Sequence, residues 1–277
     1  MIEVGLGSYQ LEIATEFGPR VMGLRRDDGP QVLARPGGDA GNEPPNGVYR
    51  FRGGHRLWAA PEIAEITYAA DDHECSVEEV DGAVTITGPS DDAQLVKEIT
   101  IRADEGALML EHTIRRHSGR GPELAAWAIT QLPLGGTAIL PLIGPLTAPL
   151  PNRQLVLWPY TSMTDQRLGF GDVAISVSAD EGPPLKLGAG ASSRRLGYLR
   201  GGQLFLKEIM SKPLGTVPDF GAALQVYVGQ GFCELETLGG MVEVSNTRPA
   251  ILTERWTVLG CDDVEVARRM AVNSNKT

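Results

Sequence analysis

The sequence predicts an all-β protein, built as one large sandwich or barrel of antiparallel strands. Apolar and polar residues alternate along many short segments rich in Val, Ile, Leu, Thr and Tyr, which is typical of half-buried strands. Turn signals recur about every ten to fifteen residues, as in DDG (27–29), DEG (104–106), SGRGP (118–122) and DEGPP (180–184). The chain of 277 residues has 34 Gly and 19 Pro, which fits many turns between strands. No linker divides it, so we expect one domain, residues 1–277.

Strands are expected, in chain order, wherever the alternation is clearest. The segments are SYQLEIATEF (8–17), VTITG (84–88), QLVKEITIR (94–102), ALMLEHTIRRH (107–117), ELAAWAITQLP (123–133), QLVLWPY (154–160), VAISVSA (173–179), QLFLKEIM (203–210), AALQVYVG (222–229), FCELETLGG (232–240) and PAILTERWTVL (249–259). Gly, Pro, Asp or Asn residues bound these segments, as expected for strands that end in turns.

Only two segments predict helix. One is the turn EIAEITYA (62–69), and the other is DDVEVARRMAVN (262–273) near the C-terminus. In the second, Asp262 or Asp263 would cap the helix. The residues expected on its apolar face are Val264, Ala267, Met270 and Ala271.

Charge and composition restrict the partners. The net charge of −10 argues against nucleic acid, whose phosphates require a basic surface. The most apolar region, AILPLIGPLTAPL (138–150), is too short to span a bilayer and contains three prolines. The N-terminus lacks the pattern of a signal peptide, and three distant cysteines fit a reducing compartment. We therefore expect a soluble, cytoplasmic protein with no membrane partner, and the sequence leaves its oligomeric state open.

The string FRGGHRLWAAPE (51–62) follows a long loop rich in Gly, Pro and Asn, residues 35–50, of a kind that is often functional. Its two adjacent glycines would let the backbone approach a ligand closely. His55 is flanked by Arg52 and Arg56, and like-charge repulsion would lower the pKa of its imidazole. A neutral imidazole near pH 7 can donate one hydrogen bond and accept another.

Several segments resemble the relatives of aldose 1-epimerase (galactose mutarotase). EFGPRVMGLRRDDGPQVL (16–33) is similar to their N-terminal hairpin, and GFCELETLGG (231–240) to the strand that carries their catalytic glutamate. TERWTVL (253–259) is similar to their last strand. The string RGGHRLWxxPE (52–62) and a later WPY…DxR segment (158–167) resemble one branch of that superfamily. The resemblance covers most of the chain and implies the mutarotase β-supersandwich, whose concave face binds a sugar.

The resemblance implies an aldose 1-epimerase-like isomerase in which Glu236 is the base. The base takes the proton of the anomeric hydroxyl while an acid protonates the ring oxygen, so that the ring opens and recloses on its other face. In the characterised relatives the acid is a histidine within a His-x-Tyr-Phe-Asn string. The comparable region here, residues 124–133, contains Trp127 and Gln131 but no histidine. His55 is therefore the candidate acid, and an arginine is the alternative electrophile.

Glu234 is expected on the same strand face as Glu236. At about 3.3 Å per residue, alternation places the two carboxylates about 7 Å apart. The two charges repel each other, so one group would hold its proton longer, which suits acid–base chemistry. From alternation alone, both could equally be solvated acids on an exposed face.

A larger set of side chains would contact the sugar. Arginine forks and Lys207 would suit an acidic or phosphorylated sugar, and Trp58 and Trp158 offer faces for stacking. The candidate substrate-binding residues are Arg52, Arg56, Trp58, Glu62, Tyr160, Asp165, Arg167, Lys207 and Glu234. The structural alternatives are ion pairs for the arginines, burial for the tryptophans, and a salt bridge between Asp165 and Arg167.

Other ligand classes lack their motifs. The sequence has no GxGxxG after a strand, no P-loop, no GxSxG elbow and no DxDxDG calcium loop. Cys75, Cys233 and Cys261 do not show zinc-ligand spacing. We therefore expect no cofactor and no metal, although carboxylate and carbonyl oxygens elsewhere could hold calcium. The expected partner is a small-molecule carbohydrate.

Three functions remain open. The first is the epimerase, and the second is a non-catalytic sugar-binding or sensing protein on the same scaffold. The third is a glycosidase or lyase that uses Glu234 and Glu236. It ranks last because neighbouring positions on one strand face do not flank a bond from opposite sides.

Overall fold

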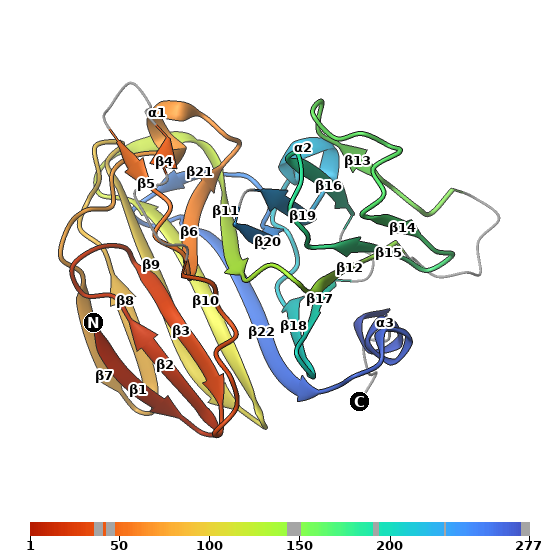
Figure 1. The fold of residues 1–277 in the computed structure, drawn as a ribbon. Coiled ribbons are helices and arrows are strands. Elements are labelled where there is room, and N and C mark those ends of the chain that lie inside the picture. Colours follow the sequence, from red (N-terminus) through yellow and green to blue (C-terminus); the bar gives the residue numbers. More distant parts are fainter. Residues whose placement is uncertain (36–40, 43–47, 143–150, 191–193, 230, 273–277) are drawn as a thin grey trace.

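The computed structural model describes residues 1–35, 41–42, 48–142, 151–190, 194–229 and 231–272. Within these ranges the chain forms two antiparallel ten-stranded sheets, a two-stranded ribbon and three short helices (Figure 1). The prediction of an all-β sandwich is therefore confirmed. Most of the loop 35–50, and the residues 143–150 of the apolar region, lie outside the described residues.

The first sheet contains strands from both halves of the sequence. Its order is β1 (Ile2–Leu6), β2 (Tyr9–Ile13), β3 (Arg20–Arg26), β6 (His55–Ala60), β11 (Arg120–Leu132), β20 (Phe232–Leu238), β19 (Leu224–Gly229), β16 (Leu185–Ala189) and β13 (Val156–Leu157), with β21 (Val242–Ser245) paired to β11. The predicted strand 154–160 is thus reduced to two residues at the sheet edge.

The second sheet is also assembled from distant segments. Its order is β14 (Leu168–Phe170), β15 (Ala174–Ser178), β12 (Thr137–Pro141), β17 (Arg195–Arg200), β18 (Gln203–Ile209), β22 (Ala250–Gly260), β10 (Ala107–Arg116), β9 (Leu95–Asp104), β8 (Ala83–Thr87) and β7 (Ser76–Val80). The ribbon is β4 (Gly41–Asn42) and β5 (Tyr49–Arg50), and the helices are α1 (Ala64–Thr67), α2 (Pro218–Gly221) and α3 (Val264–Val272).

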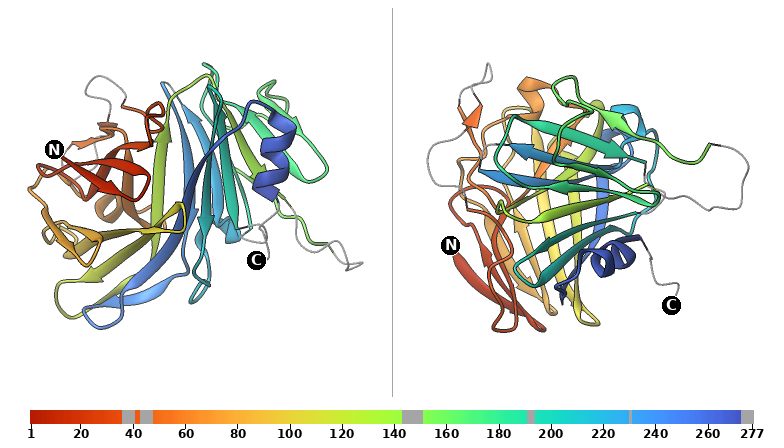
Figure 2. Two further views of the ribbon diagram at one scale, coloured as in Figure 1. Left: turned by 90° about the horizontal axis from the view of Figure 1, so that it is seen from below. Right: turned by 45° about the vertical axis from the view of Figure 1, so that its right-hand side comes forward.

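The main apolar core is formed by side chains of both sheets, whose arrangement is drawn in Figure 2. Because side chains alternate along a strand, each strand contributes every second residue to this core. On β6, Leu57 and Ala59 enter the core between the sheets, whereas Trp58 and Ala60 belong to a separate cluster on the other face. The strands at the middle of the first sheet are thus buried on both faces.

Helix α3 packs on the outer side of the second sheet (Figure 2). Asp263 caps it, because its Oδ1 accepts hydrogen bonds from the backbone N–H groups of Glu265 (2.7 Å) and Val266 (2.9 Å). The predicted apolar face is only half right. Ala267 and Ala271 are buried, but Val264 and Met270 are exposed, and at 3.6 residues per turn Met270 points about 60° away from Ala267. No helix among the described residues is long and apolar enough to cross a membrane.

A buried polar network crosses the core between the sheets, and Lys207 lies at its centre. Its Nζ donates hydrogen bonds to the carbonyls of Ala128 (2.9 Å) and Leu235 (3.2 Å) and to Thr130 Oγ1 (2.9 Å). It also lies 3.3 Å from Glu254 Oε1, and both side chains are fully buried. This lysine on β18 therefore links the second sheet to two strands of the first.

Two histidines extend the network, and their partners determine their protonation. His112 Nδ1 faces the carbonyl of Leu252 at 3.0 Å, so this nitrogen carries the proton. In the neutral ring, His112 Nε2 accepts from His55 Nε2 at 2.7 Å, and His55 Nδ1 accepts from the Thr130 hydroxyl at 2.9 Å. Burial, followed by the charge of Lys207, holds the pKa of His55 well below its usual value. Burial also lowers the pKa of His112, against the opposing effect of Glu254.

These neutral histidines predict a loss of stability in mild acid. A histidine with a depressed pKa in the folded state takes up its proton on unfolding once the pH is below about 6.5. The unfolded state then binds more protons, so the free energy of unfolding falls as the pH falls, by up to about 1.4 kcal/mol per pH unit for each histidine. Urea unfolding followed between about pH 7.5 and 5.5 measures this dependence.

Two variants make the measurement specific. The double variant His73→Gln/His117→Gln removes the two exposed histidines and is expected to keep the acid loss. Burial raises the pKa of Glu236 in the folded state, so protonation of this carboxyl stabilises the folded protein as the pH falls and opposes the effect of the histidines. Measuring the profile in a Glu236→Gln background removes this contribution. A profile that stays flat below about pH 6.5 in this background would contradict the assignment.

Candidate functional site

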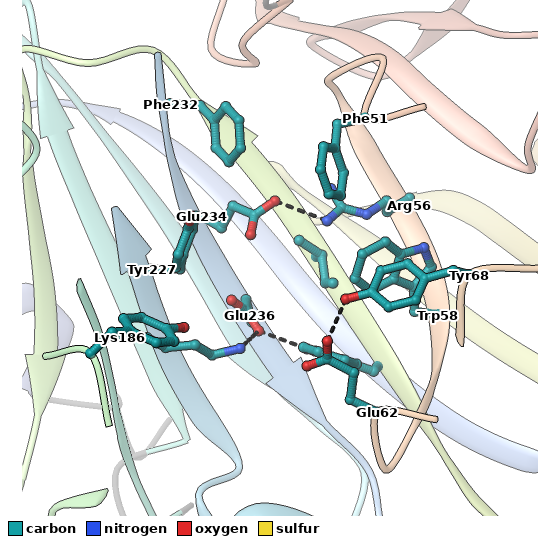
Figure 3. A pocket seen from close by; sticks show the side chains of 13 residues that line it. Phe51, Arg56, Trp58, Glu62, Tyr68, Lys186, Tyr227, Phe232, Glu234 and Glu236 are labelled. Atoms are coloured by element: carbon teal, nitrogen blue, oxygen red, sulfur yellow. Dashed lines mark hydrogen bonds and ion pairs between the residues drawn. The ribbon is translucent and has the colours of Figure 1, made fainter. Parts of the chain in front are cut away.

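A pocket of about 230 Å³ lies on the face of the first sheet that points away from the second sheet (Figure 3). Strands β6, β11, β20, β19 and β16 run side by side beneath it. Its lining residues are Phe51, Arg56, Trp58, Glu62, Tyr68, Trp127, Ile129, Tyr160, Lys186, Tyr227, Phe232, Glu234 and Glu236. The pocket is thus built on the strands that are buried on both faces.

Strand register brings the charged side chains of this face together. Arg56 on β6 is paired with Ile129 on β11, and Ile129 is paired in turn with Glu236 on β20. On the other side, Lys186 on β16 is paired with Tyr227 on β19. Since only every second residue of a strand reaches this face, the pocket collects side chains from five strands, of which only β19 and β20 are neighbours in sequence.

Glu234 is held by one cation and one amide. Its Oε1 accepts hydrogen bonds from Arg56 Nη2 and Gln131 Nε2, both at 2.9 Å. The guanidinium of Arg56 also lies over the ring of Trp58, with Cζ 4.1 Å from the ring centre. Among the described residues, Arg56 Nε and Nη1 and Gln131 Oε1 are buried without hydrogen-bond partners. Hydrogen-bonding capacity is therefore left unused beside Glu234.

Glu236 is held in the same way by a different pair. Its Oε2 accepts from Lys186 Nζ at 2.7 Å and from Trp127 Nε1 at 2.8 Å. Its other oxygen has no hydrogen-bond partner in the part of the chain that the structure describes. Burial, with a further contribution from the charge of Glu234, raises the pKa of Glu236 although Lys186 opposes the shift. A carboxylate with one free oxygen and a raised pKa is suited to accept a proton.

Aromatic side chains form most of the remaining wall. Seven of the thirteen lining residues are aromatic, namely Phe51, Trp58, Tyr68, Trp127, Tyr160, Tyr227 and Phe232. Trp58 and Trp127 meet edge to face at 5.4 Å between ring centres. Lys186 Nζ lies 4.7 Å from the ring centres of both Trp127 and Trp158. Such flat apolar surfaces suit the faces of a sugar ring.

The structure brings six of the residues predicted from the sequence into this pocket. They are Arg56, Trp58, Glu62, Tyr160, Glu234 and Glu236. Glu62 and Tyr160 are the exposed members of the lining. Glu62 accepts a hydrogen bond from the hydroxyl of Tyr68 (Figure 3).

His55 and Lys207, by contrast, do not line the pocket. His55 precedes Arg56 on β6, so alternation directs it into the core between the sheets, where it joins the network of Lys207. The low pKa expected for its imidazole is present, but burial is its main cause and Arg56 is only a minor one. Gly54, expected to meet a ligand, adopts φ +71° and packs against β3, where a Cβ would lie 2.3 Å from the carbonyl oxygen of Val21.

Arg52, Asp165 and Arg167 also lie outside the pocket and fix loops instead. Arg52 forms an ion pair with Asp72. Arg167 pairs with Asp165 at 2.7 Å, which is the salt bridge given as the structural alternative. Arg167 further donates to the carbonyl of Pro183. These side chains have partners within the protein and stabilise the chain that surrounds the sheet.

Lys186 and Tyr227 are two of the seven lining residues that are not among the site residues predicted from the sequence. A signal for Lys186 was present, because it stands between Leu185 and Leu187 in an alternating segment and therefore faces away from the core. Tyr227 stands in the same way between two valines of the predicted strand 222–229. These local patterns did not predict which strands would lie beside β20.

No protein-family model and no curated protein matches the sequence. Solved structures share its fold at low identity. A galactose mutarotase-like protein from Lactobacillus casei ATCC 334 superposes with a TM-score of 0.59 at 12% identity, over 94% of this chain and 100% of that chain. A candidate aldose 1-epimerase from Escherichia coli K12 gives 0.55 at 12%, over 93% and 98%. A galactose mutarotase-like protein from Clostridium acetobutylicum gives 0.57 at 9%, over 93% and 94%. The chain has the galactose mutarotase-like fold.

The pairing of Arg56 with Glu234 predicts a specific pattern of stability. Arg56→Met leaves the carboxylate of Glu234 buried without its cation, and we expect a loss of about 3 kcal/mol in the free energy of unfolding. The double variant Arg56→Met/Glu234→Gln removes the uncompensated charge and is expected to recover part of that loss. Urea unfolding of the four members of this cycle measures the coupling.

The neighbouring Arg52 supplies the matched control. It pairs with Asp72 nearer the surface, so Arg52→Met is expected to cost less than about 1 kcal/mol. Equal losses for the two arginine variants, or strictly additive effects in the cycle, would contradict the role assigned to Arg56.

Proposed function

We propose that this chain, which has the galactose mutarotase-like fold, binds a small carbohydrate in the pocket and interconverts its anomers with Glu236 as general base. The observation that carries the proposal is the state of Glu236. It is a buried carboxylate with a raised pKa, one oxygen held by Lys186 and Trp127, and the other left without a partner among the described residues. A base of this kind can take the proton of an anomeric hydroxyl and later return it.

The rest of the pocket supports a carbohydrate ligand. Sugars present hydroxyl groups around a ring whose two faces are partly apolar, so they combine hydrogen bonding with stacking. Arg56 lines the pocket, and its Nε and Nη1 donors lack hydrogen-bond partners among the described residues, so a sugar hydroxyl could accept from them. Trp58 and Trp127 offer the stacking surfaces. Similar solved structures that are described as galactose mutarotase-like support the same class of ligand.

The charges of the pocket favour an uncharged sugar. Both cations of the lining, Arg56 and Lys186, already form ion pairs with Glu234 and Glu236. Glu62 adds a third carboxylate that has no ion-pair partner among the described residues. A phosphate or carboxylate on the ligand would therefore meet excess negative charge. This argues against the acidic or phosphorylated sugar that the arginines and Lys207 suggested from the sequence.

The alternative is a non-catalytic sugar-binding or sensing protein. One observation favours it: none of the residues that line the pocket is a histidine, whereas the characterised relatives use a histidine as the acid. Binding of a sugar without faster anomer exchange would support this alternative over the epimerase.

Replacement of the base tests the catalytic proposal. Wild-type protein is expected to accelerate anomer exchange of at least one aldose, followed by exchange NMR across a panel of aldohexoses and aldopentoses. Glu236→Gln keeps the shape of the side chain but cannot take a proton, so we expect kcat to fall about 10²- to 10⁴-fold. Activity should also fall in acid through a pKa higher than that of an ordinary glutamate, because protonation removes the base.

An exposed glutamate provides the control. Glu78→Gln on the outer strand β7 makes the same chemical change on the surface and is expected to leave the rate unchanged. If wild-type protein accelerates the exchange of no sugar in the panel, the epimerase proposal fails.

A second test concerns the charge of the ligand. We expect a neutral aldohexose to have kcat/KM at least about tenfold above that of its 6-phosphate, a difference of about 1.4 kcal/mol. Glu62→Gln removes the unpaired carboxylate and should reduce the ratio of kcat/KM for the neutral sugar to kcat/KM for its 6-phosphate. Preference of the wild type for the phosphorylated sugar would contradict the charge argument.

A further inference from the structure

The proposed reaction needs an acid as well as a base, and chemistry restricts where the acid can lie. The hydroxyl oxygen that loses its proton and the ring oxygen that gains one are bonded to the same carbon. The acid and the base must therefore both reach the same ligand, each at hydrogen-bond distance from its own oxygen, so they must lie on the same side of the sheet. His55 is excluded by this requirement, because it faces the core on the opposite side of the sheet from Glu236.

Most other side chains of the pocket are poor proton donors. The guanidinium of Arg56 does not release a proton in proteins. Partial burial, together with the negative charges of Glu234 and Glu236, raises the pKa of Tyr160 and of Tyr227, which makes both weaker acids. Glu234 is an acceptor, since its Oε1 receives hydrogen bonds from Arg56 and Gln131.

Lys186 has the position and the free donors that an acid requires. Its Nζ lies 2.7 Å from Glu236 Oε2, and its side chain is buried at the pocket wall. Of its three N–H groups, one donates a hydrogen bond to Glu236, and the other two have no hydrogen-bond acceptor within the described ranges. The contrast is with Lys207, whose three N–H donors are all engaged by two carbonyls and a hydroxyl. Lys186 therefore has donors left for a ligand, and Lys207 does not.

We infer that Lys186 is the general acid of this site and, with Glu236, forms a lysine–glutamate couple that opens and recloses the sugar ring. The inference rests on the proposed function. Glu236 takes the proton of the anomeric hydroxyl, the electrons of that O–H bond form the carbonyl, and the bond from C1 to the ring oxygen breaks. The ring oxygen takes a proton from the Lys186 ammonium.

Reclosure reverses each transfer. After rotation about the bond from C1 to C2, the freed hydroxyl oxygen attacks the aldehyde carbon and gives its proton back to the neutral amine of Lys186. The carbonyl oxygen receives the proton held by Glu236. Protons and electrons balance, and both residues end in their starting states.

The conservative variant Lys186→Arg is the decisive experiment. Arginine keeps a positive charge beside Glu236 but does not give up its proton, so it separates proton donation from positioning. We expect kcat for anomer exchange to fall about 10²- to 10⁴-fold in Lys186→Arg and in Lys186→Met. The KM of Lys186→Arg should change far less than kcat. Lys212→Arg, the same change at an exposed lysine, is the matched control.

The outcomes separate this inference from the function it rests on. Wild-type exchange that is lost in Glu236→Gln and in both Lys186 variants supports the couple, provided that thermal unfolding shows the variants to be folded. Near wild-type activity in Lys186→Arg would overturn the inference and leave the proposed function intact, because the lysine would then only position Glu236. If Lys186→Arg does not fold, retained activity in Lys186→Met would likewise overturn it. If the wild-type protein does not accelerate anomer exchange of any sugar, both the inference and the proposed function are overturned.

Discussion

Neutralisation of two carboxylates on one buried strand is the constraint on which the pocket depends. Glu234 and Glu236 lie on the same face of β20 and are almost completely buried. A buried charge is costly unless it is paired and hydrogen-bonded, so each needs its own cation within reach. Arg56 supplies one from β6 and Lys186 supplies the other from β16, and each of these strands lies two places from β20, on opposite sides of it. The order of strands in the first sheet is thus tied to the chemistry of the site.

The strand β6 shows how one short segment serves both faces of the sheet. Its odd-numbered residues enter the core between the sheets, where His55 joins the buried network with Lys207. Its even-numbered residues, Arg56 and Trp58, reach the pocket. The buried network connects one face of the first sheet to the second sheet, and the side chains of the opposite face line the pocket. The unusual density of polar residues in FRGGHRLWAAPE therefore reflects a strand that is buried on both sides.

Local patterns were sufficient for half of the strands and for part of the site. Period-two alternation located 11 of the 22 strands in the described residues, and β6 and β16, which carry Arg56 and Lys186, were not among them. Asp263 was a recognisable helix cap. Alternation also placed Glu234 and Glu236 on one face, because the rule holds for any strand. Residues 55–60 were not predicted as a strand, so alternation was not applied to them, and His55 was expected beside Arg52 and Arg56 at a ligand. Only the pairing of β6 with β11 and β3 decides which face His55 takes.

The sequence by itself determined the fold class, the two-residue period of about half of the strands and the chemical character of several residues that face the pocket. The tertiary structure decided which of them meet. Lys186 and Glu236 are 50 residues apart, and Arg56 and Glu234 are 178 apart, so no local pattern relates them. Their contacts arise because hydrogen-bonded strands from distant segments lie side by side in the first sheet and present alternate side chains to one face. Burial, which also requires the whole sandwich, then gives Glu236 its raised pKa and His55 its neutral state.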